Sequence, residues 1–434
     1  MKRLLSFAMF FCLVVTVQAQ NISREVINRT VEKSVEQYFQ VYKTLHAHPE
    51  LSLCEKNTSK LIADQMRHLG LEVTENVGGY GVVGVLRNGN GPVLMLRADM
   101  DALPVKEATG LPYASEVITE VNGTPTPVMH ACGHDMHSTI LLGLLNSLTE
   151  NKKAWKGTIV AVAQPAEEIG AGARNMIEDG LLIRFPCPDR AFGWHMAPQF
   201  SAGTIAYTMG PALAGVRDFD ITFYGKGTHG AFPHNGIDPI LMAASAVLEY
   251  QTIISRNVIT TEPAVLTVGA FNGGSRPNIV PEKVELKITT RYFNDAVGDQ
   301  IEKRIREITN SCAAGFGMDK MPDISVYGML SPVINNTELM DRALSAMATV
   351  ISKDNLLESP INMVAEDFST YSRAIAAQKG LSEPAPTAHF WIGASKSATE
   401  ISGTLHSPTF HPEFRESFTT AVVALTAAVI EIQQ

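Results

Sequence analysis

Short apolar segments alternate with amphipathic helical patterns along most of this chain, and this alternation restricts the possible folds more than any other feature. Strands are expected at 81–86, 92–96 and 157–163, and helices at 59–69 and 138–148. This alternation is typical of a largely parallel sheet covered by helices, because a parallel crossover needs a long connecting element. The sequence therefore predicts an α/β domain whose functional groups lie where strands end and loops begin.

A second unit is expected near the middle of the chain. Strand, helix, strand, strand, helix and strand patterns follow one another at 218–224, 239–256, 264–271, 284–293, 296–314 and 322–327. This order is that of a ferredoxin-like α+β sandwich, and 434 residues exceed what one hydrophobic core usually serves. We therefore expect a first domain built from residues 20–212 and 331–434, with a second domain inserted at 213–330.

Residues 1–19 are typical of a secretory signal peptide. Two basic residues precede an apolar run from Leu4 to Val17, which is too short to span a bilayer, and Ala19 is suited to the position before a cleavage site. We expect cleavage there, which would leave an exported protein, periplasmic or secreted, without a membrane anchor.

Charge and cysteine content argue against two classes of protein. The formal net charge is -9, and no basic cluster interrupts the scattered charges, so nucleic acid is not an expected partner. The cysteines that follow the expected cleavage point are too few for a disulfide scaffold. No disulfide is assigned among Cys54, Cys187 and Cys312.

The densest cluster of metal-binding side chains lies at 129–137, where the sequence reads MHACGHDMH. Imidazole and thiolate groups suit zinc and its first-row neighbours. Cys132 and His134 are two residues apart on an expected extended loop, so both can point at one site. The sequence therefore predicts a metal centre immediately before the helix expected at 138–148.

Acidic residues and histidines follow the ends of other apolar runs. QPAEE at 164–168 comes directly after the strand expected at 157–163. Adjacent carboxylates on an irregular loop can face different directions, so one can hold a metal while its neighbour reaches a water bound to that metal. The acidic residues of RADMDALP at 97–104, together with His195 and His406, supply further side chains for such a centre.

Taken together, these motifs resemble the zinc-dependent aminoacylase and carboxypeptidase superfamily, in particular its hippurate and indole-acetyl-amino-acid amidohydrolase branch. The resemblance runs from HAHPEL at 46–51 to LHSP at 405–408. It also includes RADMDALP, MHACGHDMH, QPAEE, GKGTHGAFPH at 225–234 and AEDF at 365–368. Such a match covers nearly the whole mature chain.

The resemblance implies a metal-dependent amidohydrolase that cuts the amide bond of N-acyl amino acids carrying acetyl, benzoyl, indole-acetyl or longer acyl groups. It implies two divalent ions, Zn²⁺ first, with Mn²⁺, Co²⁺ or Ni²⁺ as alternatives, and Glu167 as the general base. Asp99 stays outside the ligand set, although other branches have a ligating histidine there. The implied metal ligands are Cys132, His134, Glu168, His195 and His406.

The resemblance also gives the inserted domain a role as a lid that can form a homodimer contact. His229 matches the lid histidine that steadies the oxyanion, and Asn278 matches a position near the carboxylate of the substrate. Arg276 stands where a small residue is common and is expected to assist Asn278. The link at 116–126 is longer than is usual in this branch.

Three alternatives remain open. GKGTHG at 225–230, with Glu249 further along, fits a dinucleotide-binding fingerprint, but residues 232–236 interrupt the place where a phosphate-binding helix must begin. A dipeptidase or carboxypeptidase of the same superfamily would differ only on the acyl side of the substrate. A non-catalytic exported binding protein is expected to lack the base or a ligand, and this chain contains all of them.

Overall fold

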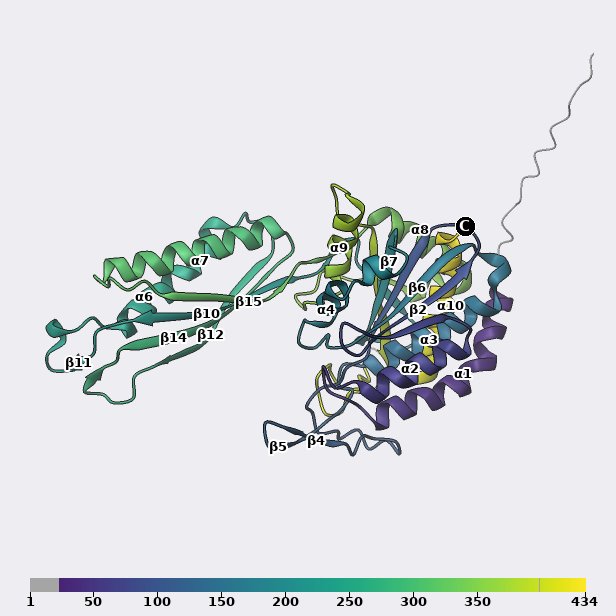
Figure 1. Ribbon diagram of the computed structural model, residues 1–434, viewed down its shortest axis with the longest axis horizontal. Coiled ribbons are helices and arrows are strands. Elements are labelled where there is room, and N and C mark those ends of the chain that lie inside the picture. Colours follow the sequence, from purple (N-terminus) through teal and green to yellow (C-terminus); the bar gives the residue numbers. More distant parts are fainter. Residues whose placement is uncertain (1–22, 398) are drawn as a thin grey trace, which may run out of the picture.

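The computed structural model describes residues 23–397 and 399–434, which form a large α/β unit and an elongated second unit beside it (Figure 1). The signal peptide expected at 1–19 lies outside the described residues. Among the described residues, no helix combines the length and the apolar character that a membrane crossing requires. The cysteines in this part of the chain are all free.

A mixed eight-stranded sheet forms the centre of the large unit. Strand β3 pairs in parallel with β6 and β7, and β7 pairs in parallel with β18, whereas the pairs β1·β2, β2·β6 and β8·β18 are antiparallel. The parallel centre confirms the expected α/β class. In spatial order the strands are β1 (Glu72–Val77), β2 (Gly81–Asn88), β6 (Gly157–Gln164), β3 (Val93–Asp99), β7 (Arg190–Ser201), β18 (Thr387–Ser395), β8 (Ile205–Tyr207) and β17 (Leu356–Glu358).

Helices cover both faces of this sheet, and each face has its own apolar core. The first face carries α1 (Arg24–Ala47), α2 (Lys56–His68), α3 (His134–Glu150), α8 (Thr337–Val350) and α10 (Phe414–Ile432). The second face carries α4 (Gly172–Glu178), α5 (Leu181–Arg184) and α9 (Ser369–Lys379). Helix α3 is buried on almost every side, because it contacts α1, α2 and α10 as well as the sheet.

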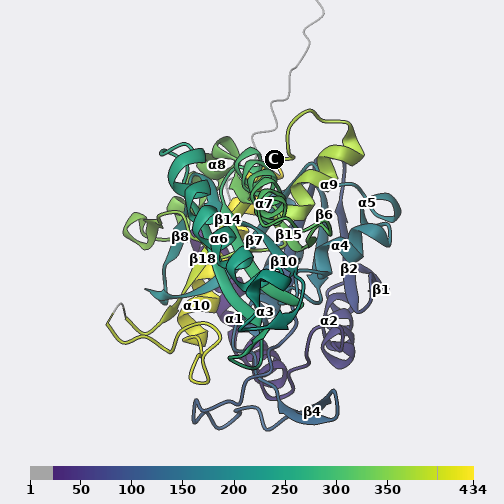
Figure 2. The same cartoon turned by 90° about the vertical axis from the view of Figure 1, so that its left-hand side faces the viewer.

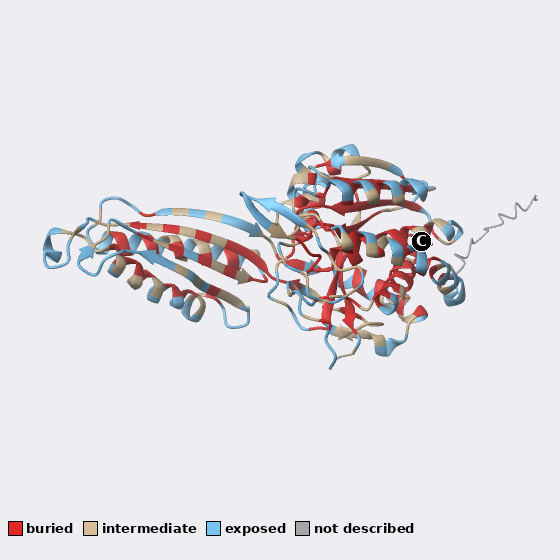
Figure 3. Ribbon diagram, turned by 90° about the horizontal axis from the view of Figure 1, so that it is seen from below, coloured by how far each residue is buried: buried red, intermediate tan, exposed pale blue. Residues whose placement is uncertain are grey.

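The second unit has the predicted β-α-β-β-α-β order. Its four strands lie in the order β12 (Ala264–Gly273), β14 (Lys283–Tyr292), β10 (Gly215–Tyr224) and β15 (Asp323–Leu330), and α6 (Pro239–Thr252) and α7 (Asp295–Gly315) cover one face. Phe219, Ile221 and Phe223 of β10 face those helices, while alternate residues face outward, which Figure 3 shows as alternating buried and more exposed stripes. We call this unit the lid.

Three short pairs of strands complete the described fold. Strands β9 (Gly210–Leu213) and β16 (Val333–Asn335) pair where the chain enters and leaves the lid. Strands β11 (Thr228–His229) and β13 (Ile279–Val280) pair at the far end of the lid. The long link expected at 116–126 forms an exposed hairpin of β4 (Ile118–Val121) and β5 (Thr124–Pro127), which projects from the large unit (Figure 2).

Candidate metal centre

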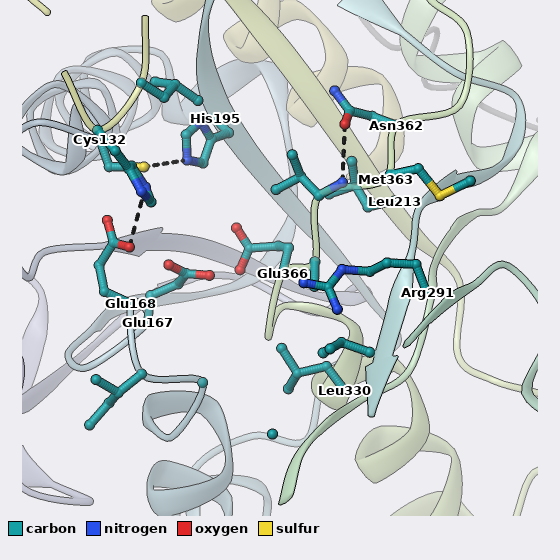
Figure 4. Close-up of a pocket in the computed structure, with 18 of the residues that line it drawn as sticks. Cys132, Glu167, Glu168, His195, Leu213, Arg291, Leu330, Asn362, Met363 and Glu366 are labelled. Carbon is teal, nitrogen blue, oxygen red and sulfur yellow. Dashed lines mark hydrogen bonds and ion pairs between the residues drawn. The ribbon is translucent and has the colours of Figure 1, made fainter. Parts of the chain in front are cut away.

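Four of the five side chains expected to bind metal, Cys132, Glu168, His195 and His406, line one pocket at the carboxyl ends of the central strands (Figure 4). The fifth, His134, is fully buried, and its ligand atom lies within 4.8 Å of those of Cys132 and His195. Glu168 follows β6, and His195 lies within β7. Cys132 precedes α3, and His134 is the first residue of that helix. The turn between them requires Gly133, whose φ is 84° and whose hypothetical Cβ would lie 3.0 Å from Met196 Cγ.

The ligand atoms are spaced as metal ligands are. Cys132 Sγ lies 3.3 Å from His195 Nε2, and Glu168 places one carboxylate oxygen 3.7 Å from His134 Nε2 and the other 3.4 Å from His406 Nε2. Two ligand atoms on one tetrahedral ion, each about 2.1 Å from it, are about 3.4 Å apart. Five compact groups of possible ligands occur among the described residues, and Cys132 belongs to two of them, one with His134 and His195 and one with Glu168 and His406.

Hydrogen bonds outside the centre leave the correct atoms free to bind metal. His134 Nδ1 donates to Asp101 Oδ1 at 3.2 Å, and His134 Nε2 is buried without a partner among the described residues. His195 Nδ1 donates to the Met196 carbonyl at 2.8 Å, so its Nε2 carries the lone pair. Glu168 Oε1 is also buried and unpaired in the described structure. Since buried polar atoms are normally paired, this donor set fits divalent ions.

Asp99 and His137 lie close to the centre but are occupied by other contacts. His137 Nδ1 donates to Asp99 Oδ1 at 2.5 Å, and His137 Nε2 accepts from the Met196 amide at 2.7 Å. The other oxygen of Asp99 accepts from the buried Arg97 at 2.7 Å. Both carboxylate oxygens of Asp99 therefore accept hydrogen bonds from protein groups, although Asp99 also forms a compact group of possible ligands with His134 and His137.

Glu167 occupies an acidic, enclosed environment beside the ligands. Burial first, and then the nearby carboxylates of Glu366 and Asp367, raise the pKa of Glu167 well above its usual value. The buried guanidinium of Arg97 lies 2.9 Å from Glu366 and 2.8 Å from Asp367, which balances part of this negative charge. Glu366 and Asp367 belong to the AEDF motif at 365–368, and no local sequence pattern indicates that this motif lies close to Glu167.

The three lid residues expected to contact substrate lie away from this centre. His229 lies on β11, and Asn278 is beside it, because the Gly230 amide donates to the Asn278 carbonyl at 2.8 Å. Arg276 precedes Asn278 in the same exposed loop. This group lies at the far end of the lid in Figure 1 and lines no part of the pocket around the metal ligands. The structure therefore brings the three together with one another but not with the centre.

The pocket has a cavity volume of about 910 Å³ and is lined by both units. Its lid wall contributes Arg291 of β14, which faces the metal ligands across the pocket (Figure 4). Among the described residues that line the pocket, Arg291 is the only one with a permanent positive charge. Arg291 has no local signature in the sequence, because it is a single arginine on an alternating strand.

Comparisons with known proteins identify a family that the chain matches over most of its length. The family model described as peptidase family M20/M25/M40 matches residues 95–431. The chain is 37% identical to N-acetyl-L-cysteine deacetylase of Bacillus subtilis over 346 residues, which cover 79% of this chain and 78% of the relative. It is 36% identical to hippurate hydrolase of Campylobacter jejuni over 334 residues, which cover 75% of this chain and 82% of the relative.

A solved structure has a similar fold. The crystal structure of a dinuclear metal-binding peptidase of the M20 family from Bacillus subtilis matches with a TM-score of 0.75 and 28% sequence identity. The match covers 93% of this chain and 99% of the solved chain, so it includes both the sheet-centred unit and the lid.

Proposed function

The chain belongs to peptidase family M20/M25/M40 and is a metal-dependent amidohydrolase, and we propose that it hydrolyses the amide bond of N-acyl amino acids. The observation that carries the proposal is a single pocket with metal ligands and Glu167 on one side and Arg291 on the other. An N-acyl amino acid has a scissile amide and a free carboxylate a short distance apart, which this arrangement matches. The names of the two curated relatives point to the same class of substrate.

Glu167 is the proposed general base. Two divalent ions held by the five ligands would polarise the amide carbonyl and lower the pKa of a water. Glu167 is adjacent in sequence to the ligand Glu168, lines the pocket and has a raised pKa. It can therefore accept the proton of the attacking water and return it to the leaving amine. No covalent intermediate is needed.

Arg291 is the proposed partner of the substrate's carboxylate. It is the cation that faces the centre in this structure, whereas Asn278 and Arg276 are remote from it. The roles expected for Asn278, Arg276 and His229 require the far end of a lid, from this chain or from a second copy, to approach the centre.

We also propose that the lid forms a homodimer contact and that the protein is exported. In the described part of the chain, strand β12 lies at the edge of the lid sheet, so its outer backbone groups can pair with a strand of a second copy. Export is supported by the pattern of residues 1–19. Sedimentation analysis tests the first proposal, and N-terminal sequencing of protein recovered outside the cytoplasm tests the second.

A substrate panel tests the proposed reaction. Protein loaded with Zn²⁺ or Mn²⁺ is assayed against acetyl, benzoyl, indole-acetyl and long-chain acyl amino acids, against dipeptides, and against N-acyl amino acids whose carboxylate is amidated. We expect turnover of free N-acyl amino acids that exceeds turnover of their amidated forms. Faster turnover of dipeptides would favour the peptidase alternative. Absence of any turnover in metal-loaded protein would favour the binding-protein alternative.

A further inference from the structure

The loop that carries Glu167 and Glu168 contains a residue in an unusual backbone conformation. Ala166 has a φ of 53°, in the left-handed region that non-glycine residues rarely adopt. It follows β6 and directly precedes the proposed base and ligand. A rotation of the backbone at this residue would therefore change the direction of both carboxylates.

Two carboxylates from distant parts of the chain hold this loop. Glu55 Oε1 accepts from the Ala166 amide at 2.8 Å. Asp101 accepts from the next two amides, with Oδ1 3.1 Å from Glu167 N and Oδ2 3.0 Å from Glu168 N. Three successive backbone N–H groups are thus paired with side-chain oxygens in place of water.

The carbonyl of Ala166 is held as well. It accepts from the amides of Ala171 and Gly172 at 3.1 and 3.0 Å. Gly172 packs so closely on the loop that a Cβ would lie 1.6 Å from the Pro165 carbonyl oxygen. Both backbone polar groups of Ala166 are therefore satisfied only while the loop keeps its tight, left-handed turn.

Glu55 is a fully buried carboxylate at the start of α2. It lines no part of the pocket, and its Oε2 is buried without a partner in the described structure. A buried acidic group is unfavourable unless its contacts outweigh the loss of water. Glu55 accepts a hydrogen bond from one residue far away in the sequence, the Ala166 amide, which is 111 residues further along the chain.

We propose that Glu55 is a positioning residue, which directs Glu167 and Glu168 into the metal centre by holding Ala166 in its left-handed conformation. The proposal rests on the proposed function insofar as Glu167 is the base and Glu168 a ligand. Without Glu55, the Ala166 amide is buried and unpaired, and the ordinary right-handed or extended conformations of alanine compete with the left-handed one. Asp101 still holds the two following amides, so the loop is displaced and not released.

Activity and metal affinity should report this displacement. Misplacing a reacting group by about 1 Å can cost about 10²-fold in rate. We expect Glu55→Ala to lower kcat by about 10- to 10²-fold, with KM changed less than about 3-fold because Arg291 and the lid wall are unaffected. We also expect weaker Zn²⁺ binding, measured by competition with a chelator, because Glu168 is displaced.

A conservative variant and a matched control separate positioning from general stability. Glu55→Gln keeps an oxygen acceptor in the same place and should keep kcat within about 3-fold. Asp189→Ala removes another carboxylate that holds a backbone amide, that of Val93 at 2.7 Å, at the opposite end of β3 from the site. This control is expected to lower the melting temperature without changing Zn²⁺ affinity. Wild-type kcat in Glu55→Ala, or an equal loss in Glu55→Gln, would overturn the proposal.

A second substitution tests the conformation itself. Glycine adopts the left-handed region without strain, so Ala166→Gly in the Glu55→Ala background should recover roughly 3- to 5-fold in kcat. A double variant that is no better than Glu55→Ala would count against the proposed link between Glu55 and Ala166.

Failure of the proposed function would be distinguishable from failure of this inference. A wild-type protein that binds Zn²⁺ but cleaves no N-acyl amino acid, together with weakened Zn²⁺ binding in Glu55→Ala, would refute the function and support the positioning role. An active wild-type protein with unchanged kcat and Zn²⁺ affinity in Glu55→Ala would support the proposed function and refute the positioning role.

Discussion

Removal of the positive charge of Arg291 tests how the substrate is recognised. Arg291 Nη1 donates to Thr289 Oγ1 at 2.6 Å and to the Thr290 carbonyl at 2.9 Å. These contacts fix one side of the guanidinium group and leave its other nitrogen atoms available to a carboxylate. Methionine has a similar length and no charge, so Arg291→Met removes the interaction with little loss of volume.

The expected magnitude follows from the contacts and the exposure of Arg291. A hydrogen bond that involves a charged group contributes about 1.5–3 kcal/mol, and an arginine can make two to one carboxylate. The side chain of Arg291 is 29% exposed, and Asp218 Oδ1 lies 4.0 Å from Nη1, so water and a competing carboxylate reduce this contribution. We expect kcat/KM to fall by about 30- to 300-fold, which corresponds to about 2 to 3.4 kcal/mol.

The assay compares N-acyl amino acids with their amidated forms in both proteins. In the wild-type protein, amidation should lower kcat/KM by a similar factor, and in Arg291→Met the difference between the two substrates should nearly disappear. Lys287→Met is the matched control, because Lys287 lies four residues earlier on the same strand and face, is paired with Asp220 at 3.0 Å, and is outside the pocket. It should change kcat/KM less than about 2-fold.

Retention of the full preference for the free carboxylate in Arg291→Met would refute the proposed role of Arg291. An equal loss of activity on free and amidated substrates would refute it too, since Arg291 would then act on something other than the carboxylate.

Three further predictions concern the centre, the lid and stability. Glu167→Gln should retain metal and lower kcat by about 10²- to 10⁴-fold. Glu168→Ala should contain less metal, measured by elemental analysis, and should melt at a lower temperature. Metal loss in Glu167→Gln with retention in Glu168→Ala would exchange the roles of the two residues. His229→Ala should lower kcat by about 10²- to 10³-fold with little change in melting temperature, and an unaltered kcat would remove it from the mechanism. Burial lowers the pKa of His46, but hydrogen bonds to two buried carboxylates outweigh burial and raise it to about 9. The raised pKa of His46 should add about 3 kcal/mol to the free energy of unfolding below pH about 6.5, and this contribution should be lost as pH rises through about 9. A difference in unfolding free energy between wild type and His46→Gln that does not change with pH would contradict this.

Hydrophobic periodicity alone predicted the fold class and most of the elements near the site. The strand expected at 157–163 is β6 (Gly157–Gln164), and the helix expected at 138–148 is the centre of α3. That helix begins four residues earlier, at His134, because Gly133 adopts a left-handed conformation that no periodicity reveals. Local sequence patterns predict these elements because a helix or strand that buries one face repeats its apolar residues at a fixed spacing.

The metal-binding motifs were also readable from the sequence, because thiolate, imidazole and carboxylate groups lie close together within short segments. Glu55 and Arg291 had no such signature. Glu55 contacts Ala166 across 111 residues, and Arg291 faces the ligands only because one end of the lid lines the same pocket as the large unit. The distance of His229 from the centre depends in the same way on where the lid lies.

The sequence by itself therefore determined the fold class, the order of the elements and the chemistry concentrated in each motif. The tertiary structure decided which distant side chains converge, because strand order and the position of the lid are set by packing between segments far apart in the chain.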